Sequence, residues 1–167
     1  MGYIKTRAMP RRSIRHARTK RECLHVPEVL TRDAPTQPSP TESSRILIID
    51  DNPGVVETLK MLLDLNGYTT HTAHDTLEGL EVAEQVRPAI ILLDIGLPKI
   101  DGWECCRRIR QRSWGDQVMV YALTGLGQDN DRLRSQQAGF DMHFVKPVDP
   151  ELLLTVLEAT RLHPRAH

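Results

Sequence analysis

The stretch Ala89-Ile-Ile-Leu-Leu-Asp-Ile-Gly-Leu-Pro-Lys-Ile-Asp-Gly102 contains the clearest signal of the fold. It opens with the apolar run Ala89–Leu93, as expected of a strand that is buried on both faces of a sheet. An acidic residue, Asp94, follows this run, and Gly96–Gly102 predicts a loop because it is punctuated by Gly and Pro. The segment Trp103–Arg112 predicts a helix. We therefore predict a strand, a loop and a helix in succession.

The same order of elements repeats on both sides of this stretch. Short apolar or β-branched runs predict four further strands, at Ile46–Ile49, Tyr68–Thr72, Gln117–Leu123 and Met142–Val145. Helical patterns follow these strands: from Pro53 to a stop at Asn66-Gly67, along Leu77, Leu80 and Ala83 before Pro88, and within Leu126–Ala138 and Pro150–Leu162. Alternation of this kind is typical of an α/β protein with a parallel sheet and helices on both faces.

Apolar residues at helical spacing predict which helix faces are buried. In the first helix these residues are Val55, Leu59, Leu62 and Leu63, and in the last helix they are Leu152, Leu153, Val156 and Leu157. We expect both groups to face the core.

Composition excludes several classes of protein. The three cysteines, Cys23, Cys105 and Cys106, form no C-x-x-C pair, which argues against a disulfide scaffold or a zinc site. One of the two adjacent cysteines is expected in the core, with no redox role. The longest apolar runs, Ala89–Leu93 and Val118–Leu123, are far shorter than the ~20 residues that a membrane helix needs. No secretory signal is evident, so we expect a cytoplasmic protein without membrane insertion.

The net charge of zero hides two unlike segments. Residues 1–44 hold nine Lys and Arg against four Asp and Glu, whereas residues 45–167 hold 13 against 18. The first segment has no hydrophobic period and ends in a run rich in Pro, Ser and Thr, so we predict a disordered tail or linker over residues 1–44. A short C-terminal tail is predicted over residues 163–167.

The basic run Arg11–Arg21 within the first segment lacks interleaved aromatic residues and any recognisable reading helix. We therefore do not expect nucleic-acid binding, and a solvated tail is the simpler interpretation. Two alternatives stay open: the tail acts as an effector that binds nucleic acid, or the native protein starts further downstream.

Polar residues stand at the carboxyl ends of four predicted strands. They are Asp50 and Asp51, Asp94, Thr124 and Lys146. Because functional loops of parallel sheets lie at this edge, we expect these side chains to converge. Two like charges ~4 Å apart repel by ~4 kcal/mol at an effective dielectric of ~20, and Mg²⁺ is a natural compensator for carboxylates. An ammonium and a hydroxyl can hold phosphate oxygens, so the group predicts phosphoryl chemistry at an aspartate nucleophile.

Each of these residues also has a structural interpretation. Asp51 can cap the helix that begins at Pro53, Thr124-Gly125 can form a turn, and Lys146-Pro147 can form a loop. None of these features alone indicates function. Their placement at consecutive strand ends, in this order, favours the functional interpretation.

Four motifs resemble one known family. They are Ile48-Ile-Asp-Asp-Asn-Pro53, Leu92-Leu-Asp-Ile-Gly-Leu-Pro-Lys-Ile-Asp-Gly102, Ala122-Leu-Thr-Gly125 and Ala138-Gly-Phe-Asp-Met-His-Phe-Val-Lys-Pro147. On these motifs, segment 45–162 is similar to the receiver domain of two-component response regulators, the CheY-like fold. The resemblance covers the whole segment and implies a three-layer α/β/α sandwich with five parallel strands in the order 2-1-3-4-5.

The resemblance implies a role for each acidic strand-end residue. Asp94 is expected to be the phosphoacceptor. Asp51 and Asp94 are expected to bind Mg²⁺ directly, together with the backbone carbonyl of Gly96. Asp50 is expected to act on the metal through water.

The resemblance also implies how the state of the site is transmitted. Lys146 is expected to contact the phosphoryl group, Thr124 to be the switch hydroxyl, and Pro147 to follow a cis peptide bond. The switch aromatic of the family is often Tyr or Phe, whereas this chain has His143, which is expected either to switch or to be a partly exposed edge-strand residue. Strand alternation directs the neighbouring Phe144 toward the other face.

The function implied is that of a phosphoacceptor signalling domain rather than an enzyme. A sensor histidine kinase or a histidine phosphotransfer protein would donate the phosphoryl group, and a downstream protein would read the altered face. No output domain follows Leu162, so we expect a single-domain receiver or a receiver related to those of hybrid kinases. The rivals are a phosphorylation-independent pseudo-receiver and a metal-dependent phosphohydrolase. Gly96 argues against the phosphohydrolase because it stands where such enzymes typically carry a second Asp.

Overall fold

The computed structural model describes residues 44–125 and 129–162, and the side chains within 129–132 are not part of that description. Residues 1–43 of the predicted N-terminal tail and the whole predicted C-terminal tail lie outside these ranges, as do the first three residues of the predicted helix Leu126–Ala138.

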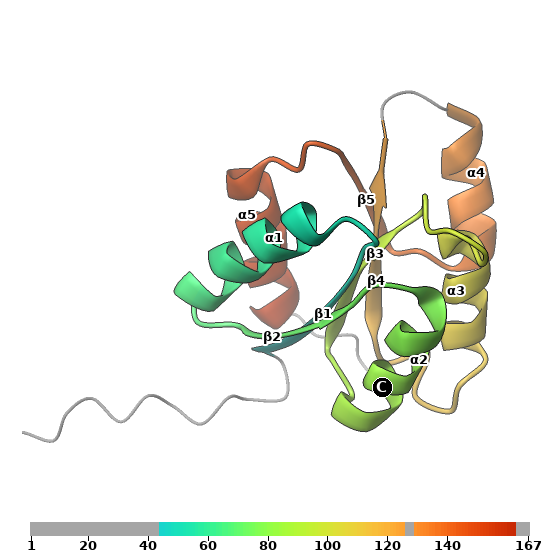
Figure 1. Cartoon of the computed structure of the whole chain (residues 1–167), viewed down its shortest axis with the longest axis horizontal. Coiled ribbons are helices and arrows are strands. Elements are labelled where there is room, and N and C mark those ends of the chain that lie inside the picture. Colours follow the sequence, from blue (N-terminus) through green and yellow to red (C-terminus); the bar gives the residue numbers. More distant parts are fainter. Residues whose placement is uncertain (1–43, 126–128, 163–167) are drawn as a thin grey trace, which may run out of the picture. The chain divides into compact units, whose positions relative to one another are not determined.

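Five strands and five helices alternate along the described residues (Figure 1). The strands are β1 (Arg45–Ile49), β2 (Thr69–Ala73), β3 (Ile90–Asp94), β4 (Met119–Thr124) and β5 (Met142–Val145). The helices are α1 (Pro53–Leu65), α2 (Thr76–Val86), α3 (Gly102–Arg110), α4 (Asp129–Ala138) and α5 (Pro150–Leu162). The predicted bounds of β5 and α5 are confirmed.

The five strands form one parallel sheet in the order β2-β1-β3-β4-β5, which confirms the expected topology. Helices α1 and α5 cover one face, and α2, α3 and α4 cover the other (Figure 1). Alternate strand residues feed the two cores: Leu47, Ile91 and Val120 pack on the α2–α3 side. Ile48, Leu92 and Tyr121 pack on the α1–α5 side, so the central strands β1, β3 and β4 are buried on both faces.

Helix α1 begins with an Asn-Pro pair, which corrects one structural interpretation of the sequence. Asn52, not Asp51, is the N-cap: its side chain accepts hydrogen bonds from the backbone N–H groups of Gly54 and Val55. Pro53 occupies the first helical position, where no N–H donor is needed. Gly67, with φ of +80°, allows the chain to turn after the helix. Asp51 is exposed and is left available for another role.

Several predicted element bounds shift by one to three residues. Strand β2 begins at Thr69 because Tyr68 is instead buried between α1 and α5. Helix α3 spans Gly102–Arg110 rather than Trp103–Arg112, since Asp101 caps it through the backbone N–H of Glu104. Strands β3 and β4 each extend by one residue at their carboxyl ends, so that Asp94 and Thr124 are the last strand residues rather than the first loop residues.

One predicted core residue is at the surface instead. Leu152 is 54% exposed, because it lies beside the buried stripe of α5 rather than within it. In α5 that stripe is formed by Leu153 and Leu157. The expectation that one cysteine of the adjacent pair faces the core understates the burial, since Cys105 and Cys106 are both fully buried.

Arg110 joins the loops at the amino ends of β4 and β5 through an ion pair and several hydrogen bonds, which we call the Arg110 clasp. The sequence did not reveal this contact. Arg110 pairs with Asp141 at 2.7 Å and donates further hydrogen bonds to the carbonyls of Gly139, Gly115 and Val118. Asp141 also accepts the backbone N–H of Val120 at 2.7 Å. This clasp fixes the loops before β4 and β5 and therefore the register of both strands.

Helices long and apolar enough to cross a membrane are absent from the described ranges. The peptide bond between Lys146 and Pro147 is cis, as expected.

Candidate functional site

Parallel pairing of β1 with β3 brings the first acidic residues together. Ile49 pairs with Leu93 in register, so Asp50 and Asp94, the next residue in each case, lie side by side at the carboxyl edge of the sheet. Thr124 ends the neighbouring strand β4, and Lys146 directly follows β5. The strand-end residues thus come from four adjacent strands.

Three carboxylates form a cluster at this edge. Asp50, Asp51 and Asp94 can each offer one oxygen atom, and these atoms lie within 4.8 Å of one another. Asp50 is fully buried, Asp94 is 7% exposed, and Asp51 is exposed. The cluster therefore combines two buried carboxylates with one carboxylate that is exposed to solvent.

Lys146 is the cation that faces this cluster. Its Nζ atom lies 2.6 Å from Asp50 Oδ2 and 3.0 Å from Asp94 Oδ1. Burial lowers the pKa of Lys146, but hydrogen bonds from its ammonium to Asp50 and Asp94 outweigh burial, and the net shift is upward. The ammonium therefore stays charged, and one positive charge is shared between two of the three carboxylates.

Backbone N–H groups fix the orientation of the two buried carboxylates. The N–H of Asn52 donates to Asp50 Oδ1 at 2.9 Å, and the N–H of Gly96 donates to Asp94 Oδ1 at 3.1 Å. The Gly96 loop is held close to the end of β3, because the N–H of Gly102 donates to the carbonyl of Ile95 at 3.0 Å. A Cβ atom added to Gly102 would stand 2.7 Å from the Cα of Ile95, so only glycine permits this approach.

The two predicted switch residues contact β5 and Phe140. The Oγ1 atom of Thr124 donates to the carbonyl of Phe144 at 3.4 Å, so this hydroxyl is directed at β5. The ring of His143 is partly buried and lies 6.0 Å from that of Phe140, between ring centroids. Phe144 packs with Tyr121 on the α1–α5 side, which confirms the alternation predicted for β5.

The donor set of the cluster fits Mg²⁺. Magnesium prefers hard oxygen ligands and retains water, and the cluster supplies carboxylate oxygens with one side open to solvent. With a single lysine nearby, the three carboxylates carry a net negative charge that a divalent cation can neutralise. The residues present therefore fit the metal that the sequence predicts.

A cavity of about 390 Å³ adjoins the cluster, and no sequence motif indicated it. It lies between the start of α1 and the loop after β5, and its lining residues are Asn52, Gly54, Val55, Thr58, Leu59, Lys146, Pro147 and Val148. Lys146 and Asn52 connect this lining to the carboxylates, because the Lys146 ammonium pairs with Asp50 and Asp94 and the backbone N–H of Asn52 donates to Asp50.

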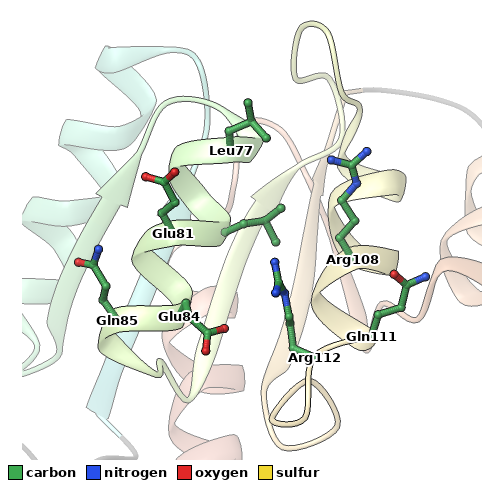
Figure 2. A pocket seen from close by; sticks show the side chains of 8 residues that line it. Leu77, Glu81, Glu84, Gln85, Arg108, Gln111 and Arg112 are labelled. Carbon is green, nitrogen blue, oxygen red and sulfur yellow. The ribbon is translucent and has the colours of Figure 1, made fainter.

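A larger cavity of about 620 Å³ lies between α2 and α3 and contains none of the strand-end residues (Figure 2). Glu81 and Glu84 lie on its α2 wall, and Arg108 and Arg112 on the opposite wall. Its size alone therefore does not make it the functional site.

Comparison with known proteins identifies the class. A family model described as the response regulator receiver domain matches residues 46–158. The chain is 37% identical over 115 residues to the DNA-binding dual master transcriptional regulator RpaA of Synechocystis, covering 69% of this chain and 48% of that protein. It is 39% identical over 117 residues to the response regulator MprA of Mycobacterium ulcerans, covering 70% of this chain and 50% of that protein. The chain belongs to the response regulator receiver domain family.

Solved structures agree with this assignment. A response regulator from Chloroflexus aurantiacus matches with a TM-score of 0.69 and 27% identity, covering 75% of this chain and 100% of that chain. The receiver domain of a Pseudomonas aeruginosa sensor histidine kinase, described with a magnesium ion in its active-site cleft, matches with a TM-score of 0.65 and 30% identity. That match covers 71% of this chain and 97% of the other chain.

The family sets the general function but not the output. As a receiver domain of the two-component type, the chain is a signalling domain rather than an enzyme that turns over an external substrate. The chain spans about half the length of the curated relatives it matches. DNA binding is named for RpaA, so the relatives do not support the expectation that nucleic acid is not a partner.

Proposed function

We propose that this protein accepts a phosphoryl group on Asp94 from the phosphohistidine of a sensor histidine kinase or a histidine phosphotransfer protein. An oxygen of the Asp94 carboxylate attacks phosphorus, the P–N bond to the donor histidine breaks, and a P–O bond to Asp94 forms. The observation that carries this proposal is the cluster of three carboxylates with one shared lysine at the edge of the sheet.

Asp51, Asp94 and the backbone carbonyl of Gly96 would hold Mg²⁺ directly, and Asp50 would hold it through water. When bound, the metal supplies positive charge against the phosphoryl oxygens during transfer. Exposure of Asp51 supports this assignment, as does the choice of Asn52 rather than Asp51 as the helix cap. Neither capping nor any ion pair then competes for the Asp51 carboxylate among the described residues.

The Lys146 ammonium would turn from Asp50 toward the new phosphoryl group and pair with one of its oxygens. Its Nζ atom already lies 3.0 Å from the acceptor carboxylate, so a small side-chain rotation is sufficient. Since a single ammonium is compact and turns freely on its stem, it can follow charge from one oxygen to another. This makes Lys146 a stabiliser of the acyl phosphate rather than a fixed partner of Asp50.

The output would be a change in the face formed by α4, β5 and α5. In that change Thr124 turns from the Phe144 carbonyl to the phosphoryl group, and His143 turns inward. Exposed apolar residues support a protein-binding role for this face, namely Leu133, Met142, Val145 and Leu152. The partner would be a downstream protein.

The test is intact mass after incubation with acetyl phosphate and Mg²⁺. We expect an adduct of ~80 Da on the wild type, the mass of one phosphoryl group, with loss of the adduct in EDTA or in Asp94→Asn. An adduct that persists in Asp94→Asn would reject Asp94 as the acceptor. If neither acetyl phosphate nor a phosphorylated kinase gave an adduct, the pseudo-receiver alternative would replace the proposal.

A further inference from the structure

Two tryptophans hold the ends of α3 against its neighbouring helices. Trp103 lies in the first turn of α3 and contacts α4, whereas Trp114 follows the helix and contacts α2. Each donates its indole N–H to the neighbouring helix, and an arginine lies over each ring, Arg134 of α4 over Trp103 and Arg87, the C-cap of α2, over Trp114. The two contacts are of the same kind, although one acceptor is a hydroxyl and the other a carboxylate, and they lie at different distances along the chain from Asp94.

Two interactions join Trp103 to α4, and a third joins α4 to the neighbouring Asp101. Its Nε1 atom donates to the Oγ atom of Ser135 at 2.9 Å, and Ser135 is fully buried. The guanidinium of Arg134 lies 3.9 Å from the ring centroid, within cation–π range. Arg134 also reaches back to Asp101, with 3.5 Å between Nη2 and Oδ2.

The other side of Trp103 leads directly to the phosphoacceptor loop. Asp101 caps α3, and the N–H of Gly102 donates to the carbonyl of Ile95, the residue after Asp94. Trp103 is therefore one residue away from a backbone segment that packs against the end of β3. The path from Asp94 to α4 consists of Ile95, Gly102 and Trp103.

We propose that Trp103 is a positioning residue that couples the loop around Asp94 to the placement of α4. A ligand that moves the loop shifts α3 at its first turn, and the Trp103 contacts pass this shift to Ser135 and Arg134. By thermodynamic linkage, the placement of α4 then alters the affinity of the site for its ligands. This inference rests on the proposed function, because it names how the state of that site is transmitted.

Trp114 supplies a matched control for this proposal. Its Nε1 atom donates to Glu84 Oε2 at 2.8 Å, and the Arg87 guanidinium lies 5.1 Å from its ring centroid. Glu84 belongs to the wall of the cavity between α2 and α3, which holds none of the strand-end residues (Figure 2). Trp114 therefore has an indole hydrogen bond and an arginine over its ring, as Trp103 does, without the path through Gly102 and Ile95 to Asp94.

The experiment measures hydrogen exchange of the α4 amides in the whole protein, with Mg²⁺ alone and with Mg²⁺ plus beryllofluoride as a phosphoryl mimic. The variants are Trp103→Phe and Ser135→Ala, which each remove the indole hydrogen bond, and Trp114→Phe as the control. We expect the ligand-induced change in α4 exchange to fall at least about threefold in the first two and to stay unchanged in the control. Ser135→Ala keeps the test valid if Trp103→Phe folds poorly.

The outcomes separate this inference from the proposed function. An α4 response that is equal in Trp103→Phe, Ser135→Ala and Trp114→Phe would overturn the coupling role, even where the acetyl phosphate adduct forms normally. A missing adduct in the wild type would count against the proposed function instead, and Mg²⁺ alone would then test the coupling. Beryllofluoride with Mg²⁺ that binds without altering α4 exchange in the wild type would also overturn the coupling role.

Discussion

Two buried ion pairs at opposite edges of the sheet have similar local geometry and different surroundings. Asp141 pairs with Arg110 at 2.7 Å, and Asp50 pairs with Lys146 at 2.6 Å. Each carboxylate is almost fully buried, and each also accepts one backbone N–H, from Val120 and Asn52 respectively. Distance and burial alone would not tell the two pairs apart.

Charge balance and hydrogen bonding distinguish them. One cation meets one carboxylate in the Arg110 pair, and Arg110 also donates to three backbone carbonyls, so the pair is neutral and its donors are used. Lys146 meets two of three clustered carboxylates, so the cluster keeps a negative charge. We call the Arg110 pair saturated because its charge is balanced and each guanidinium nitrogen donates to an acceptor, and such a pair stabilises the fold. We call the Lys146 pair unbalanced because its cluster keeps a negative charge, so it can bind a cation and, with that cation, an anionic group.

The largest expected effect is that of breaking the saturated pair. Arg110→Met leaves Asp141 as a buried charge without its partner and also removes the donors to three carbonyls. We expect the free energy of unfolding to fall by about 3–5 kcal/mol, measured by urea denaturation. Arg112→Met is the control, because Arg112 is exposed and its loss should change stability by less than about 0.5 kcal/mol. A loss below about 1 kcal/mol in Arg110→Met would show that the clasp is not structural.

The unbalanced pair should respond to metal. We expect Mg²⁺ at ten times its dissociation constant to raise the free energy of unfolding by about 1.4 kcal/mol, because only the folded cluster binds it. Thermal unfolding with and without Mg²⁺ measures this gain. Asp51→Asn should abolish it, while Asp141→Asn should retain it. A gain that survives in Asp51→Asn would place the metal elsewhere.

Removing charge should have opposite consequences in the two pairs. Asp94→Asn relieves repulsion within the cluster, so we expect the free energy of unfolding to stay unchanged or to rise by up to about 1 kcal/mol. Asp141→Asn should lower it by at least about 2 kcal/mol, because the Arg110 charge stays buried without its counterion. Urea denaturation of both variants gives the sign. Equal destabilisation would remove the distinction between the two pairs.

The smallest effect concerns two buried thiols whose pKa is shifted mainly by burial. Burial raises the pKa of Cys105 and Cys106 to about 12. Since the folded pKa is above the ordinary value, their contribution to stability is complete well below the ordinary pKa of ~9 and is lost as pH rises through that value toward 12. We expect the two thiols to account for a loss of about 0.8 kcal/mol between pH 7 and pH 9. Between pH 7 and pH 9, the measured fall in the free energy of unfolding should be smaller in Cys106→Ala than in the wild type by half of this loss. An identical pH dependence of the two proteins would contradict the prediction.

Much of the fold and site could be predicted because the relevant signals are local. Apolar runs such as Ala89–Leu93 mark buried strands, and polar residues at their ends mark one edge of the sheet. The strand order came only from the resemblance to receiver domains, since local patterns carry no information on which strands pair. The roles of Asp94, Thr124 and His143 stay predictions.

The features that could not be predicted from the sequence depend on contacts between distant residues or on competition between adjacent residues for one role. The Arg110 clasp joins residues 31 positions apart, and the indole bond of Trp103 joins residues 32 positions apart. Asn52 and Asp51 are both good capping residues, and only the backbone geometry decides for Asn52. Leu152 is an apolar residue of the kind usually found in a core, yet it lies beside the buried stripe of α5 and is exposed.

The close approach of Gly102 to the end of β3 has a consequence for natural and laboratory variation. Any larger residue there would push α3 away from Ile95 and disturb the loop that carries Gly96. In a library of all single substitutions selected for signalling, position 102 should therefore tolerate as few replacements as Asp94 itself. A residue with no functional group would then rank beside the phosphoacceptor, because it sets the spacing on which the chemistry depends.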